Sequence, residues 1–133
     1  MHASNPKLFL ATTAFVEAAT GLCLLILPVV PFAILLGLEH ASTEAIFIGR
    51  IAGAALLAIG IASWMARTDT LTRAQLGLLT GILVYDMAAS ILLVFAATVL
   101  KLIGILLWPA VALHAVLAIW CFRCLRSVHL ENR

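Results

Sequence analysis

Hydrophobic residues form four long runs along the chain, and short segments between these runs hold most of the polar and charged residues. Each run is close to the roughly 20 apolar residues that an α-helix needs to cross a bilayer. The pattern predicts an all-α, four-transmembrane-helix bundle that forms a single integral membrane domain over residues 1–133. We expect its helices at about residues 8–27, 44–67, 73–98 and 103–124.

Residues 28–43 are the longest link between two predicted helices, and their conformation stays open in the sequence. Pro28 and Pro31 are expected to end or kink the first helix, since proline lacks the backbone N–H that a helix interior requires. The apolar first half of the link fits either a short interfacial helix or a re-entrant turn. Glu39 and His40 then return the chain to water.

Composition agrees with a membrane location. Hydrophobic residues make up 65% of the chain and charged residues 11%, whereas soluble domains have about 45–50% and about 25%. The formal net charge of +2 argues against nucleic acid as a partner. The expected partners are the lipid bilayer and either further copies of the chain or other subunits of a membrane complex.

Basic residues are distributed unequally between the two ends of the predicted bundle. Lys101 stands at one end, and the other end has Lys7, Arg67, Arg73, Arg123, Arg126 and Arg133. Because basic residues in short loops favour the cytoplasmic side, both termini are predicted to be cytoplasmic. The chain is then a multi-pass protein of a bacterial inner membrane.

The two halves of the chain share a pattern that suggests a parallel two-hairpin repeat. Trp64 and Arg67 near the end of the second helix match Trp120 and Arg123 in the fourth. The first and third helices each have an acidic residue ahead of two alanines. The alternative is a chance similarity of composition.

Each predicted span contains one ionisable side chain within its apolar run: Glu17, Asp86 and His114 near mid-depth, and Arg50 in the first two turns of its helix. The long side chain of Arg50 can reach either inward to the acids or outward to headgroups and Glu44. An arginine in hydrocarbon costs about 2.5–3.5 kcal/mol near the centre of a helix and less near the edge. Such groups usually face the bundle interior and pair with one another. We therefore expect the four side chains to share one interior cluster.

The charges of this predicted cluster do not balance. Glu17 and Asp86 would contribute −2 and Arg50 +1, so either one acid is neutral or His114 is protonated. This arrangement is typical of a proton-binding or cation-binding site, but an ion-pair network that only fixes the helix orientations is an equal alternative. Tyr85 is either a packing residue or a hydrogen-bond donor to a carboxylate or a quinone carbonyl.

Two further features suggest cofactor chemistry, each with a simpler alternative. Ala110, one turn before His114, would leave room for haem, but a hydrogen-bonded core histidine is the favoured interpretation. Cys121 and Cys124 have the C-x-x-C spacing of redox pairs, yet the predicted topology places them in the reducing cytoplasm. The sequence predicts no metal site.

Glycines four residues apart occur in two of the predicted helices. These are Gly49 and Gly53 in the second helix and Gly77 and Gly81 in the third. Such spacing lets two helix backbones approach closely. The pattern favours a compact bundle, with the contacts either within one chain or between chains.

Several of these motifs together resemble small bacterial four-helix membrane proteins, and the general plan is similar to the DoxX-like group. The motifs are an acid before small residues in the first helix, Gly49-Arg50 in the second, Tyr85-Asp86 in the third and Trp108-Pro109 through His114 in the fourth. Some DoxX-like proteins accompany quinone-linked oxidation of sulfur compounds. The resemblance assigns no catalytic residue to this chain.

A second resemblance is to small multidrug transporters, which have four helices and a central glutamate in the first, where Glu17 stands. Those proteins act as dimers that exchange protons for cationic substrates. Arg50 and Asp86 depart from their pattern.

Taken together, the sequence favours a non-enzymatic membrane protein whose cluster binds a proton, a quinone-like molecule or a lipid, as a subunit of a larger complex. A proton-coupled transporter and a quinone-linked redox subunit are the alternatives.

Overall fold

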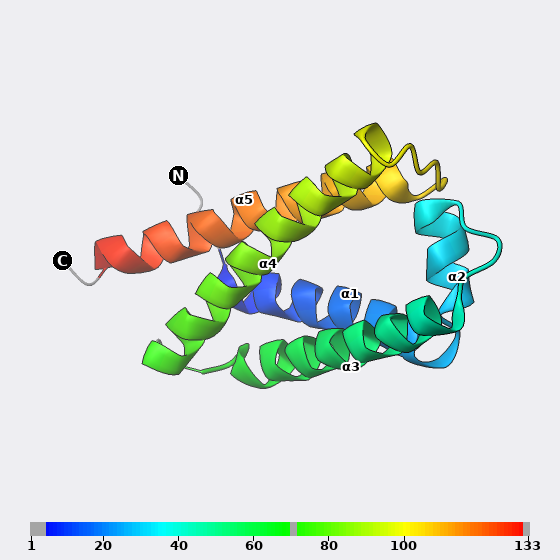
Figure 1. Ribbon diagram of the computed structural model, residues 1–133. Coiled ribbons are helices and arrows are strands. Elements are labelled where there is room, and N and C mark those ends of the chain that lie inside the picture. The colour runs from blue at the N-terminus through cyan, green and yellow to red at the C-terminus, as the bar shows by residue number, and fades with distance from the viewer. Residues whose placement is uncertain (1–4, 70–71, 132–133) are drawn as a thin grey trace.

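The computed structural model describes residues 5–69 and 72–131. Four long helices run back and forth in this part of the chain, and two short helical segments, α2 and η1, lie between the first two of them (Figure 1). The helices are α1 (Pro6–Ile26), α2 (Val29–Pro31), η1 (Phe32–Leu36), α3 (Thr43–Ala66), α4 (Arg73–Thr98) and α5 (Leu107–Glu131). The four long ones are apolar enough to cross a membrane, the last over Leu107–Ser127. The predicted all-α architecture with four spans is confirmed.

Side-chain caps explain where three of the long helices begin. The Asn5 side chain accepts hydrogen bonds from the backbone N–H groups of Lys7 and Leu8, and Pro6 occupies the first turn of α1. Ser42 and Thr72 cap α3 and α4 in the same way. These oxygens satisfy N–H groups that have no partner within the helix. The polar residues before each apolar run therefore set the helix starts.

The fourth long helix begins and ends later than the sequence predicts, because it covers Leu107–Glu131 instead of about residues 103–124. Lys101 has a positive φ of 57°, and the backbone of Gly104 packs directly against that of Leu35. The Leu106 N–H then donates to the Ile34 carbonyl at 2.8 Å. Pro109 consequently lies in the first turn of α5, where proline is tolerated, and not at an internal kink.

The link over residues 28–43 forms a helical cap at one end of the bundle. Its short helix α2 continues into the π-helical turn η1, which ends at Gly37 in the left-handed conformation with φ of 71°. The hydrogen bond from Leu106 attaches this segment to the start of α5. Of the two conformations left open by the sequence, the segment adopts a short helix.

The four long helices form two hairpins, α1 with α3 and α4 with α5 (Figure 1). In the first hairpin the backbones of Gly21 and Gly53 are in contact, because a Cβ at Gly53 would lie 2.7 Å from the Gly21 carbonyl oxygen. Gly60 packs against Ala18 in the same interface. Glycine is required here because any side chain would separate the two backbones.

The second glycine pair does not mediate contacts within the described chain. Gly77 and Gly81 are exposed, and a Cβ at either position would meet no atom within 4 Å. The predicted close approach is therefore confirmed for Gly53 and is not seen for the pair on α4. A role of this pair between chains stays a prediction.

An apolar core joins the two hairpins near the end of the bundle that holds both termini. It brings Phe9 and Leu10 of α1 against residues of α4 and α5 that are also fully or almost fully buried: Leu79, Ile82, Leu117, Cys121 and Cys124. The ring of Trp120 packs edge-on against Phe9 at a centroid distance of 5.5 Å. The hairpins are thus held together at one end of the molecule.

Both described ends of the chain and the α3–α4 link lie at this same end, opposite α2 (Figure 1). The end includes Lys7, Arg67, Arg73, Arg123 and Arg126; Arg133 lies outside the described residues. The Arg67 guanidinium stacks 3.6 Å from the centre of the Trp64 ring. The basic residues are grouped as the sequence predicts, and both the cytoplasmic assignment and the repeat stay predictions.

Candidate functional site

Three of the four long helices bring an ionisable side chain to one point inside the protein. Glu17 of α1, Asp86 of α4 and His114 of α5 each offer a ligand atom, and these atoms lie within 4.8 Å of one another. Glu17 is 2% exposed and Asp86 1% exposed, while the His114 side chain is 14% exposed. We call these three residues the acid–histidine cluster. The sequence prediction that they meet is confirmed.

The closest pair in this cluster is Asp86 and His114. The Nδ1 atom of His114 lies 2.8 Å from Oδ1 of Asp86, so the carboxylate fixes the orientation of the imidazole ring. When Nδ1 carries the shared proton, Nε2 is left as an acceptor or a ligand atom. The pair therefore positions one nitrogen for chemistry with a second group.

Tyr85 joins the cluster through His114. Its ring meets the imidazole edge-on at a centroid distance of 5.5 Å and an angle of 83°, and it lines the same cavity as Glu17. Consecutive residues on a helix point about 100° apart, so sequence spacing alone did not place Tyr85 and Asp86 on one face. They reach the same histidine from two sides.

Two carboxylate oxygens in the cluster have no hydrogen-bond partner among the described residues, namely Oε1 of Glu17 and Oδ2 of Asp86. Leaving a buried acceptor unpaired costs roughly 1–3 kcal/mol, and more when it is charged. Buried polar atoms in native proteins are nearly always partnered. The two oxygens are therefore available to a proton or to a bound group.

Arg50 does not belong to the cluster. Its side chain is exposed on α3, and no ion pair to it occurs within residues 5–69 and 72–131. The adjacent Gly49 occupies the buried face, where the Phe32 ring packs against it. Because neighbouring positions on a helix diverge, Arg50 points outward. The expectation of one shared interior for all four ionisable residues has to be corrected for Arg50.

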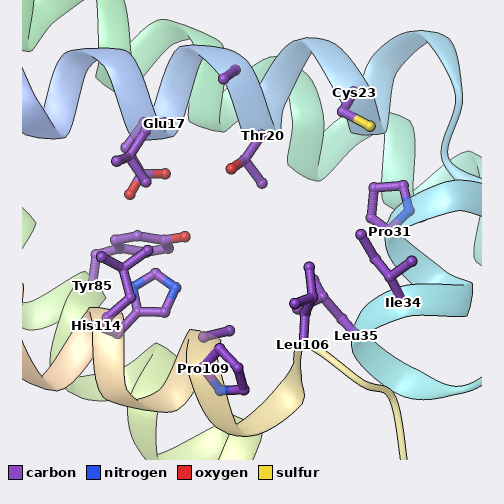
Figure 2. Close-up of a pocket in the computed structure, with 14 residues that line it drawn as sticks. Glu17, Thr20, Cys23, Pro31, Ile34, Leu35, Tyr85, Leu106, Pro109 and His114 are labelled. Carbon is purple, nitrogen blue, oxygen red and sulfur yellow. The ribbon is translucent and has the colours of Figure 1, made fainter.

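A cavity of about 400 Å³ lies beside the cluster, between the two hairpins and beneath α2 and η1. Figure 2 shows Glu17, Tyr85 and His114 converging at one end of it, with Pro31, Ile34, Leu35 and Leu106 toward the other. The remaining lining residues are Val16, Ala19, Thr20, Cys23, Pro109, Ala110 and Leu113. The cavity is largely apolar, with its polar groups concentrated at the cluster.

The cavity opens to the surroundings of the protein. Ala19, Leu106, Pro109 and Leu113 line it and are exposed. Ala19, Pro109 and Leu113 belong to apolar spans, and Leu106 directly precedes one, so the opening would face lipid in a membrane. A volume of this size lies within the roughly 300–1,000 Å³ of typical small-molecule sites.

Two polar residues of the cavity lining were not among the predicted site residues. Thr20 and Cys23 follow Glu17 at intervals of three on α1, and all three side chains line the cavity (Figure 2). The spacing i, i+3, i+6 places side chains on neighbouring parts of one helix face. This spacing is the sequence signal that could have identified Thr20 and Cys23, but it is weak without knowledge of which face of α1 meets the cavity.

Cys121 and Cys124 lie away from the cavity, in the apolar core between α1, α4 and α5. Both are fully buried, and the Cys121 thiol donates to the Leu79 carbonyl at 3.1 Å. Reactive cysteines are usually partly exposed in electropositive surroundings. Burial in this core favours a packing role, and the redox role stays a prediction. A haem ligand role for His114 also stays a prediction.

Comparisons with known proteins identify no relative. No family model matches the chain, and no curated protein or solved structure matches it. What the structure supports is a small integral membrane protein with four candidate spans and a buried Glu/Asp/His cluster.

Proposed function

We propose that this protein binds a quinone-like molecule in the cavity between its hairpins, with the polar ring of the ligand at Glu17, Tyr85 and His114. The observation that carries the proposal is an apolar cavity, open along a membrane-facing surface, whose polar lining converges at one end. Sites for small amphiphiles combine apolar walls with a few convergent polar groups.

The side chains of the cluster suit a ring whose oxygens are carbonyls in the oxidised form and hydroxyls in the reduced form. The Tyr85 hydroxyl can donate a hydrogen bond to a carbonyl of the oxidised ring. The unpartnered Oε1 of Glu17 and Nε2 of His114 can accept from a hydroxyl of the reduced ring. The same site thus has partners for both forms, whereas an unsubstituted hydrocarbon would leave all of these groups unpaired.

The position of the opening supports a ligand that arrives from the membrane. Exposed Leu106, Pro109 and Leu113 would contact an apolar tail that continues into the lipid. A phospholipid acyl chain is also apolar, but it has no ring that could contact the polar end of the cavity. We therefore place the quinone-like ligand ahead of lipid, in keeping with the resemblance to DoxX-like proteins.

We infer that the role is binding without catalysis, as the sequence favours. The C-x-x-C cysteines, the redox candidates, lie away from the cavity. We infer that the protein acts as a quinone-binding subunit of a larger complex in a bacterial inner membrane.

Filling the cavity should weaken ligand binding. Ala110 lines the cavity, so Ala110→Phe is expected to weaken binding of decylubiquinone at least tenfold because the ring occupies the ligand volume. Ala112 is exposed on another face of α5, and Ala112→Phe should bind as the unmodified chain does. Titration calorimetry of the full chain in lipid nanodiscs measures both.

Equal binding by Ala110→Phe and the unmodified chain would contradict the proposal. The transporter alternative predicts instead that a lipophilic cation binds, that quinone does not, and that Glu17→Gln abolishes proton-coupled uptake into proteoliposomes.

A further inference from the structure

The structure brings together three potential metal ligands from three different helices, at a place where the sequence alone predicts no metal site. Glu17, Asp86 and His114 offer two carboxylates and an imidazole within 4.8 Å of one another. We propose that this acid–histidine cluster binds a divalent first-row transition-metal ion, with zinc as the representative. The proposal does not depend on a quinone-like ligand.

The charge of the cluster favours a divalent cation. With His114 neutral and both acids ionised, Glu17 and Asp86 would carry −2 at positions that are 2% and 1% exposed. Arg50, the expected counter-charge, is exposed on α3 and makes no ion pair within the described residues. A divalent ion would bring the net charge to zero, which greatly lowers the cost of burying two carboxylates.

The unpartnered oxygens are the second, independent indication. Oε1 of Glu17 and Oδ2 of Asp86 are buried side-chain atoms with no hydrogen-bond partner among the described residues. A metal ion would satisfy both, and it would take Nδ1 of His114 in place of the hydrogen bond between that nitrogen and Asp86. It would compete for Oε1 of Glu17 with the hydroxyl of the reduced ring proposed above. Around a tetrahedral zinc, neighbouring ligand atoms are about 3.3 Å apart, so rotations that move the side chains by about 1 Å would close the site.

The donor set selects the class of metal. Calcium takes 6–8 oxygen ligands and magnesium an octahedron of oxygens, whereas this site offers three side chains, one of them an imidazole. One nitrogen and two carboxylates suit zinc, iron(II) or manganese(II). Three protein ligands leave a coordination position open, and the cavity lies beside it.

Thr20 and Cys23 line the cavity between Glu17 and the end of the bundle beneath α2 (Figure 2). Their hydroxyl and thiol are the polar side chains that follow Glu17 along this face of α1. Because the ligands come from both hairpins, bound metal would also link α1 to the α4–α5 hairpin.

Zinc titration of the chelator-treated full chain tests the site. The chain is purified without a histidine tag, and His2, His40 and His129 are replaced by glutamine to remove adventitious ligands. We expect one zinc per chain and a higher melting temperature on loading. Affinity should fall in Glu17→Gln, Asp86→Asn and His114→Gln by at least the roughly 10–100-fold that loss of a partner of a metal ligand costs. Glu44→Gln, an exposed acid on α3, is the matched control and should bind as the parent does.

X-ray absorption of the zinc-loaded parent protein keeps the test independent of how the variants fold. It should find oxygen and nitrogen ligands, including one imidazole, and no sulfur. Sulfur ligation, unchanged affinity in folded cluster variants, or no zinc binding at micromolar concentration would each overturn the proposal. None of these measurements contains a quinone, so their failure would leave the proposed ligand site to its own test.

Discussion

Replacing Gly53 with alanine is expected to lower the free energy of unfolding by about 2 kcal/mol, within the roughly 1–3 kcal/mol typical of overpacking. The added Cβ would lie 2.7 Å from the Gly21 carbonyl oxygen and 2.8 Å from the Leu25 backbone nitrogen. Both neighbours are backbone atoms, so α1 and α3 would have to move apart. Unfolding in mixed detergent–SDS micelles, followed by circular dichroism, measures the change.

Gly81→Ala is the matched control for this prediction. A Cβ at Gly81 meets no atom within 4 Å, while the gain in helix propensity over glycine, up to about 1 kcal/mol, is the same at both positions. Gly81→Ala should therefore be neutral or stabilising. Similar values for the two variants would mean that α1 and α3 do not pack through Gly53.

A double-mutant cycle between Asp86 and His114 should give a coupling energy of about 1–2 kcal/mol. Their hydrogen bond is 2.8 Å long and joins α4 to α5. Hydrogen bonds between membrane helices average about 0.6 kcal/mol with a maximum near 1.7, and a charged, buried partner places this one at the upper end. The free energies of unfolding of Asp86→Ala, His114→Ala and the double variant provide the value.

Arg50 and Glu17 serve as the comparison pair in the same assay. Because Arg50 is exposed and lies outside the cluster, Arg50→Leu and Glu17→Gln should be additive within about 0.5 kcal/mol. Strong coupling of Arg50 to Glu17, together with none between Asp86 and His114, would contradict the arrangement of the site.

The long helices were predictable because each depends on local sequence. The α4 bounds, Arg73–Thr98, match the prediction, since Thr72 caps the first turn and an uninterrupted apolar run follows. The start of α5 was not predictable in this way, because it depends on a contact between segments that are distant in sequence. Gly104 packs on Leu35, and Leu106 bonds to Ile34.

The cluster was predictable in part for a similar reason. Ionisable residues in spans avoid lipid, which correctly brings Glu17, Asp86 and His114 together. The same rule did not hold for Arg50, whose long side chain can reach the headgroups from an exposed position. The depth of a residue in the membrane follows from its position along a span, but the direction in which a helix face points depends on the helices that pack against it.

The sequence by itself determined that this is a four-span helical membrane protein with acids and a histidine inside, because hydropathy and side-chain charge act locally. Tertiary structure alone decided which of those groups meet. It paired α1 with α3 through Gly21 and Gly53, joined the hairpins by an apolar core at one end, and left a cavity at the other. Those outcomes arise from backbone approach between distant segments, which no single stretch of sequence encodes.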